Sequence, residues 1–158
     1  MDSLMRKRCC LQKNKKIKVL HLSYSDLKGG ASISAFRLHE AINNCTNIES
    51  KMLVVEKFSK DKNVFSFENK MNLFIYKVYN KLLFHLLKFQ KKKKKISQSV
   101  NFFSILNLKS KIKKLKPDYI HIHWINSEMI SIKTLSGLNY KKIWTFTDMW
   151  PFSGTEHY

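Results

Sequence analysis

The sequence predicts an α/β fold in which a parallel β-sheet is flanked by helices. Three consecutive features predict it. The β-rich run IKVLHLSY at 17–24 leads into a glycine turn, and the spacing of apolar residues then changes from that of a strand to that of a helix. The run KMLVV at 51–55 returns to strand spacing. The order strand, glycine turn, helix, strand is typical of the start of a parallel sheet.

The first predicted helix covers the segment ASISAFRLHEAINN, and Ser32 at its start is the predicted N-cap. The apolar positions that suit a helical period are Ile33, Phe36, Leu38, Ala41 and Ile42. Gly29 and Gly30 lie directly before the helix, where bare backbone N–H groups suit a phosphate or sugar hydroxyls. The alternative is a turn that needs glycine for its geometry alone.

The second half of the chain predicts two further strands. The segment SKIKKLK forms a basic amphipathic helix that ends at Pro117, and a strand follows over 118–124. A short helix is predicted over 129–137. The apolar, β-branched and aromatic run KKIWTFT at 141–147 then predicts a fourth parallel strand.

Ligands bind outside the carboxyl ends of parallel strands. Residues 25–32, 123–126 and 147–150 follow three of these ends, so we expect them to lie near one another. There the Asp148 carboxylate can accept bonds from sugar hydroxyls, and the Trp150 indole can stack on a pyranose ring. The alternative is an N-cap aspartate and a core tryptophan.

His121 and His123 alternate along a strand and therefore point to one face of the sheet. A metal site needs a third ligand, and the spacing supplies none, so no metal site is predicted. We expect His121 to be a hydrogen-bonded core histidine and His123 to reach the crevice at the strand end.

A basic amphipathic helix is predicted over 70–95, ending in five consecutive lysines. Its lysine stripe consists of Lys70, Lys77, Lys81 and Lys88, flanked by Phe74 and Phe84, and its apolar side consists of Ile75, Tyr79, Leu82, Leu83 and Leu86. Such helices bind anionic membrane surfaces. The alternative is a helix packed on the sheet with its lysines in water.

Composition narrows the function classes. Lys and Arg number 30 against 11 Asp and Glu, a formal charge of +19 that favours polyanions. The lysines lie in one linker and on scattered helix faces without a nucleic-acid reading motif, so nucleic acid is not the expected partner. Cys9, Cys10 and Cys45 form no C-x-x-C pair, and neither a signal peptide nor a membrane span is visible. We expect reduced thiols in a cytoplasmic protein, peripheral at the inner face of the cell membrane.

Three ordered strings, KVLHLSYSDLKGGASISAFRLHEAI, LKPDYIHIHWINSEMISIKTL and WTFTDMWPFSGTEHY, closely resemble the N-terminal domain of glycosyltransferase family 4 enzymes of bacterial capsule, exopolysaccharide and O-antigen clusters. The resemblance covers 17–158, after a basic tail at 1–16. It implies a GT-B fold of two Rossmann-like domains. It also implies retaining transfer from a nucleotide-sugar to a polysaccharide or lipid-linked acceptor, without a cofactor or a bound metal.

The resemblance also implies roles for residues of this chain. Gly29, Gly30 and Ser32 would lie by the donor phosphates and the acceptor. The acceptor wall would consist of His123, Trp124, Asn126, Asp148, Trp150, His157 and Tyr158. Thr147 replaces a histidine of many relatives, and its role beside Asp148 at the reacting sugar is limited to hydrogen bonding, because a threonine hydroxyl is no acid or base near neutral pH.

The sequence ends at Tyr158, inside the domain that it resembles, and it lacks the acidic E-x7-E pair with which the family holds its donor sugar. We therefore expect an incomplete N-terminal half of a GT-B fold that is inactive alone, with a separate donor-domain chain as a candidate partner. The alternative is a non-catalytic module that binds membranes or glycans.

Overall fold

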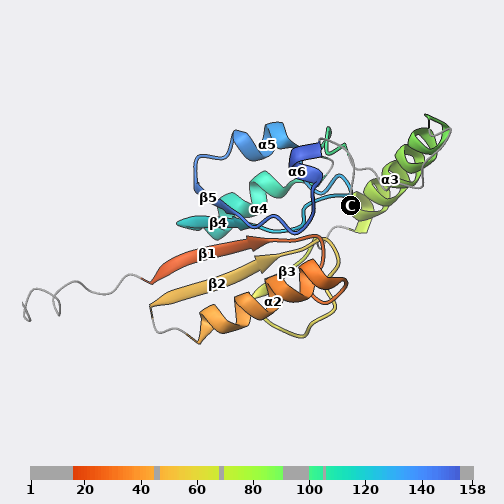
Figure 1. The fold of residues 1–158 in the computed structure, drawn as a ribbon. Coiled ribbons are helices and arrows are strands. Elements are labelled where there is room, and N and C mark those ends of the chain that lie inside the picture. The colour runs from red at the N-terminus through yellow and green to blue at the C-terminus, as the bar shows by residue number, and fades with distance from the viewer. Residues whose placement is uncertain (1–15, 45–46, 68–69, 91–99, 105, 154–158) are drawn as a thin grey trace, which may run out of the picture.

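A computed structural model describes residues 16–44, 47–67, 70–90, 100–104 and 106–153. Its centre is a sheet of five parallel strands in the order β3-β2-β1-β4-β5 (Figure 1). The strands are β1 (Ile17–Leu22), β2 (Ile48–Leu53), β3 (Val64–Phe65), β4 (Tyr119–Ile122) and β5 (Lys141–Trp144). The helices are α2 (Gly30–Asn43), α3 (Lys70–Gln90), α4 (Leu108–Leu115), α5 (Ile132–Ser136) and α6 (Trp150–Ser153). The predicted Rossmann-like α/β class is confirmed.

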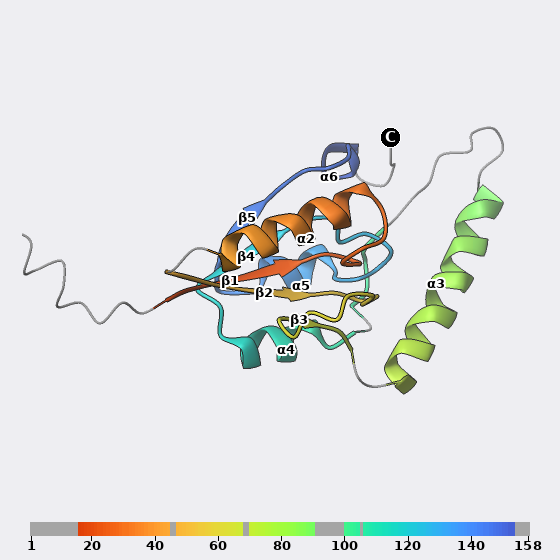
Figure 2. The same cartoon turned by 90° about the horizontal axis from the view of Figure 1, so that it is seen from below.

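The two faces of the sheet differ in chemistry. Figure 2 shows α2 on one face and α4 and α5 on the other. On the α4 and α5 face, Leu20 and Leu22 of β1 lie beside Ile120 and Ile122 of β4 in register, and all four are buried in the main core. Alternation along the strands turns the residues between them toward α2. The α2 face therefore carries histidines where the other face carries leucine and isoleucine.

The buried side of α2 corrects the predicted apolar face. Ser32, Ala35 and His39 are the buried residues of this helix, whereas the side chain of Leu38 is 37% exposed. His39 faces polar partners, since its Nδ1 lies 2.7 Å from Ser50 Oγ on β2. The same face also carries a small apolar cluster of Ala35, Met52, Val54 and Val64, against which Phe36 packs. Apolar spacing therefore located only part of the buried side, because the histidine and serine positions carry no apolar signal.

Ser32 is not the N-cap of α2, contrary to the prediction. Gly29 is the N-cap, with φ 87° and ψ 154°, and the helix has no side-chain cap hydrogen bond. Ser32 lies one turn inside, with its hydroxyl 3.5 Å from that of Ser23. Because Gly29, with its positive φ, is the N-cap, the helix begins at Gly30, two residues before the predicted cap at Ser32.

Other boundaries shift for local reasons. The basic helix α4 ends at Leu115, and Lys116 in the left-handed conformation precedes Pro117, as the proline predicted. The helix expected over 129–137 is reduced to α5, because Met129 and Ile130 are core residues of the preceding loop. The short strand β3, which pairs with β2, and the single turn α6 were not predicted.

Helix α3 confirms the helix predicted at 70–95 over its first 21 residues; residues 91–95 lie outside the described part of the chain. It stands beside the carboxyl edge of the sheet and covers neither face (Figures 1 and 2). Its anchor is the buried Tyr76, whose hydroxyl donates to the backbone carbonyl of Ser127. Helix α3 thus contacts the main core through Tyr76 and Leu73 at the edge of the sheet.

Candidate functional site

A pocket with a volume of about 10 Å³, room for about one water molecule, lies at the carboxyl ends of β4 and β5, where the sequence placed two of its three groups. Six predicted residues line it: His123, Trp124, Asn126, Thr147, Asp148 and Trp150. Thr147 is exposed to solvent, whereas the side chain of His123 is only 4% exposed. Gly29, Gly30 and Ser32 do not line the pocket.

Asp148 is the polar centre of the pocket. Its Oδ2 accepts a hydrogen bond from the Trp124 indole N–H at 2.9 Å and from Asn126 Nδ2 at 3.3 Å. Its Oδ1 accepts from the backbone N–H of Trp150 at 3.2 Å, at the start of α6. Trp150 itself is 4% exposed, as the core-tryptophan alternative predicted. The carboxylate is thus held in place by groups from two loops.

Tyr24 joins the loop after β1 to the same pocket wall. Its backbone N–H donates to the carbonyl of Trp124 at 2.8 Å, and the two rings meet edge-on with centroids 5.7 Å apart. Its hydroxyl donates to Glu56 at 3.4 Å. The loops that follow β1 and β4 therefore lie side by side, as expected for parallel strands.

The Asp26 carboxylate holds the start of the turn that leads to Gly29 and Gly30. The Asp26 carboxylate accepts backbone N–H bonds from Leu27, Phe58 and Ser59 at 2.8–3.1 Å. Burial raises the pKa of Asp26, but these bonds stabilise the charged form more strongly, so its pKa lies below the ordinary value. At Gly30 an added Cβ would meet nothing within 4 Å, so the backbone there faces open space.

Glu128 joins the loop after β4 to residues 100–102, and the sequence analysis missed it. This buried carboxylate accepts backbone N–H bonds from Val100, Asn101 and Phe102 at 2.5–3.0 Å. Asn101 returns two bonds, accepting from Glu128 N and donating to the Ile125 carbonyl. No sequence motif predicts these hydrogen bonds, because the partners of Glu128 are 26–28 residues away in the sequence.

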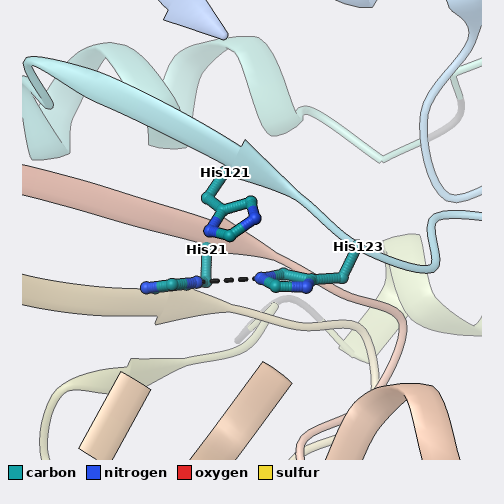
Figure 3. A group of neighbouring side chains, drawn as sticks. All are labelled: His21, His121 and His123. Atoms are coloured by element: carbon teal, nitrogen blue, oxygen red, sulfur yellow. Dashed lines mark hydrogen bonds between the residues drawn. The ribbon is translucent and has the colours of Figure 1, made fainter. Parts of the chain in front are cut away.

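Four buried histidines, His21, His39, His121 and His123, lie between α2 and the sheet and are here called the histidine layer. His21 Nδ1 lies 2.9 Å from His123 Nε2, and His121 Nε2 lies 2.8 Å from Thr145 Oγ1 (Figure 3). The sequence singled out His121 and His123 alone. His21 joins them because β1 pairs with β4 so that His21 lies opposite His121.

Burial keeps this layer neutral. It lowers the pKa of His21 to about 2 and that of His123 to about 3, with smaller contributions from neighbouring imidazoles, and it lowers the pKa of His121 and His39 as well. His39 Nε2 lies 3.3 Å from Asp61, the spacing of an ion pair. Since desolvation outweighs the attraction of Asp61, the contact is a neutral hydrogen bond.

The residues predicted to contact a membrane lie on α3. Phe74 and Phe84 are 66% and 64% exposed, and Lys77 and Lys81 are exposed as well. Among the described residues, no helix has both the length and the apolar character needed to cross a bilayer. The side chain of Lys88, and His157 and Tyr158, lie outside the described residues.

The five-stranded parallel sheet flanked by helices places the protein among Rossmann-like α/β domains. Residues 64–152 match the family model described as glycosyl transferase 4-like. This match spans more than half of the 158 residues, so the chain belongs to that family. No curated protein and no solved structure matches the chain.

Proposed function

We propose that this chain is the acceptor side of a retaining glycosyltransferase that moves a sugar from a nucleotide-sugar to a polysaccharide or lipid-linked acceptor. Family membership supports the reaction class. The observation that carries the assignment is the pocket around Asp148, because it combines a fixed carboxylate, an amide and an indole outside two parallel strands. Carboxylates, amides and aromatic rings are groups that can bind sugar hydroxyls and stack on pyranose faces.

In this proposal the pocket orients the acceptor. Asp148 and Asn126 bind acceptor hydroxyls, Trp124 holds Asp148 in its rotamer, and Thr147 donates or accepts one hydrogen bond near the transferred sugar. The resemblance assigns His157 and Tyr158 to the same wall, and both lie outside the described residues. The turn at Gly29 and Gly30 is assigned to the donor phosphates, since both residues are exposed at the start of α2. Ser32 is 3% exposed, so it has no part in this assignment.

These 158 residues contain no E-x7-E pair of the kind that the family uses to hold its donor sugar, so this proposal assigns the pocket to the acceptor. Group transfer depends on positioning donor and acceptor together and on preorganised charge around the reacting atoms. The chain alone is therefore expected to bind an acceptor with little or no turnover. A separate chain that supplies a donor domain would restore transfer.

The test separates binding from turnover. Intrinsic tryptophan fluorescence of the purified chain is followed while a panel of glycosides and polyprenyl-linked sugars is added, and release of nucleotide from UDP- and GDP-sugars is assayed in parallel. We expect a saturable fluorescence change that Asp148→Ala abolishes and no nucleotide release. Binding that is unchanged in Asp148→Ala, or absent for every saccharide, would refute the acceptor assignment.

The exposed face of α3 supports a second candidate function, docking on an anionic membrane surface. Apolar side chains on this helix face solvent, including Met71, Phe74, Leu82, Phe84 and Leu86, and Lys77 and Lys81 are exposed among them. Aromatic and apolar groups enter the headgroup region while lysines bind anionic lipids. Docking would bring the pocket close to a lipid-linked acceptor at the inner face of the cell membrane.

A further inference from the structure

We propose that His21, His121 and His123 form a binding site for a divalent transition metal ion of the zinc type. Each residue offers one imidazole nitrogen, and the three nitrogens lie within 4.8 Å of one another. The three side chains are buried and converge from two neighbouring strands (Figure 3). This site goes beyond the proposed function, which needs no metal.

The backbone already fixes the arrangement. His21 and His121 are opposite one another in the parallel pairing of β1 with β4. His123 is the residue directly after β4, and its backbone N–H still donates to the Leu22 carbonyl of β1 at 2.9 Å, so it continues the alternation of the strand. An H-x-H pair on one strand with a third histidine on its neighbour places three imidazoles on one side of a sheet. The third ligand that sequence spacing did not supply therefore comes from β1.

The separations suit a small coordination sphere. Metal–nitrogen bonds of about 2.0–2.1 Å at tetrahedral angles place ligand nitrogens about 3.4 Å apart. His21 Nδ1 and His123 Nε2 are 2.9 Å apart, and no two of the three ligand nitrogens are more than 4.8 Å apart, so changes in separation of up to about 1.4 Å reach that value. These adjustments are side-chain movements and leave the strand pairing intact.

His21 offers the nitrogen that faces its neighbours. Its Nδ1 lies 2.9 Å from His123 Nε2, whereas its Nε2 points away from His121 and His123 (Figure 3). Nε2 is buried and has no hydrogen-bond partner among the described residues. It is therefore not one of the atoms that converge on the ion, and an ordered water is a usual partner for such an atom.

The ligand set indicates the class of metal. Three imidazoles suit zinc, cobalt, nickel or copper, whereas calcium and magnesium require oxygen ligands. His121 Nε2 is hydrogen-bonded to the Thr145 hydroxyl, so Nδ1 is the nitrogen of that ring left for the metal. The same hydrogen bond holds the imidazole in one orientation. Three protein ligands leave a fourth position for water.

The experiment uses the whole 158-residue chain after chelator treatment. Cys9, Cys10 and Cys45 are replaced by serine, so that thiolates do not bind the probe. Co²⁺ is then titrated while the visible d–d absorption is recorded, and Zn²⁺ is titrated in competition. We expect one ion per chain and a four-coordinate cobalt spectrum without thiolate charge-transfer bands.

Matched variants locate the ion. His121→Gln and His21→Gln should each weaken Co²⁺ binding by at least about tenfold, as the loss of a ligand from a three-ligand site requires. His39→Gln, in the same layer but outside the cluster, and His85→Gln, on exposed α3, should leave the affinity unchanged. Equal affinity in all four variants, or no bound ion at micromolar Co²⁺, overturns the proposal.

X-ray absorption of the zinc-loaded chain needs no histidine variant and so covers the case in which one of them fails to fold. Three imidazole ligands at about 2.0 Å support the site. Fewer than three imidazoles around the ion overturn it.

Discussion

The indole N–H of Trp124 donates a hydrogen bond to the carboxylate of Asp148 at 2.9 Å. The two residues are 24 positions apart and follow different strands, so this bond ties the loop after β4 to the loop after β5. Asp148 also accepts from Asn126 and from the backbone of Trp150. The shape of the candidate acceptor pocket therefore depends on one side chain.

Replacing Asp148 by alanine removes the acceptor of three hydrogen bonds and leaves the partly buried Trp124 indole without its bond to this carboxylate. We expect the free energy of unfolding in urea to fall by about 1–3 kcal/mol. Asp148→Asn keeps one carbonyl oxygen as an acceptor and should lose less than half as much. Equal losses in both variants would contradict this prediction, because the retained carbonyl oxygen would then contribute nothing.

The glycine turn offers a matched pair of variants. Gly29 has φ 87° and ψ 154°, a backbone conformation almost restricted to glycine, so Gly29→Ala should lower the free energy of unfolding by about 1–3 kcal/mol. Gly30 begins α2 and has open space where a Cβ would lie, so Gly30→Ala should be neutral or stabilise by up to about 1 kcal/mol. Urea unfolding of both variants checks the difference. Similar effects at the two positions would contradict the role of Gly29 as a conformational cap.

The histidine layer predicts that the metal-free chain loses stability in mild acid. His21 and His123 have folded pKa values of about 2 and about 3, below the ordinary 6.5, so the unfolded chain binds more protons. Their contribution is complete above pH 6.5 and decreases as the pH falls from there toward the folded values. Each histidine costs about 1.4 kcal/mol per pH unit in that window.

Urea midpoints at pH 8, 7, 6 and 5, with a chelator present, check this prediction. His121 and His39 face the same layer, with Asp61 beside His39, and their lowered pKa values act in the same direction. His123→Gln removes one titrating group and should make the dependence on pH less steep. A midpoint that stays constant from pH 8 to pH 5 would show that these imidazoles are not neutral by burial.

Replacing Glu128 is expected to lower stability strongly, although Glu128 does not line the pocket. Glu128→Gln keeps the size of the side chain but replaces one carboxylate oxygen by an NH₂ group that faces backbone N–H donors. We expect a loss of about 2–4 kcal/mol in the free energy of unfolding, because buried donors lose their acceptor. Glu40→Gln on the exposed side of α2 is the control and should change stability by less than about 0.5 kcal/mol.

Vesicle cosedimentation tests the membrane surface on α3. The chain should sediment with phosphatidylglycerol vesicles and remain bound in 0.5 M salt, because buried aromatic rings are not screened. Phe74→Ser with Phe84→Ser should abolish the salt-resistant binding, whereas Lys77→Gln with Lys81→Gln should weaken binding mainly at low salt. No sedimentation at low salt would exclude this surface as a membrane contact.

Local sequence patterns were sufficient to locate most of the strands and the longer helices. Hydrophobic runs located β1, β2, β4 and β5, Pro117 located the end of α4, and lysine spacing located α3, because each signal depends on neighbouring residues. The general rule for parallel sheets also brought 123–126 and 147–150 to one edge. Strand β3 is only two residues long and has no periodicity to detect.

The sequence by itself determined a parallel α/β domain and the edge at which its polar pocket lies, since alternation and chain order dictate both. Only the tertiary structure decided which face of α2 is buried and which third histidine joins His121 and His123. The first outcome depends on the packing of α2 against β2. The second depends on the pairing of β1 with β4. That pairing joins residues about 100 positions apart in sequence, a distance at which side-chain spacing carries no information about contact.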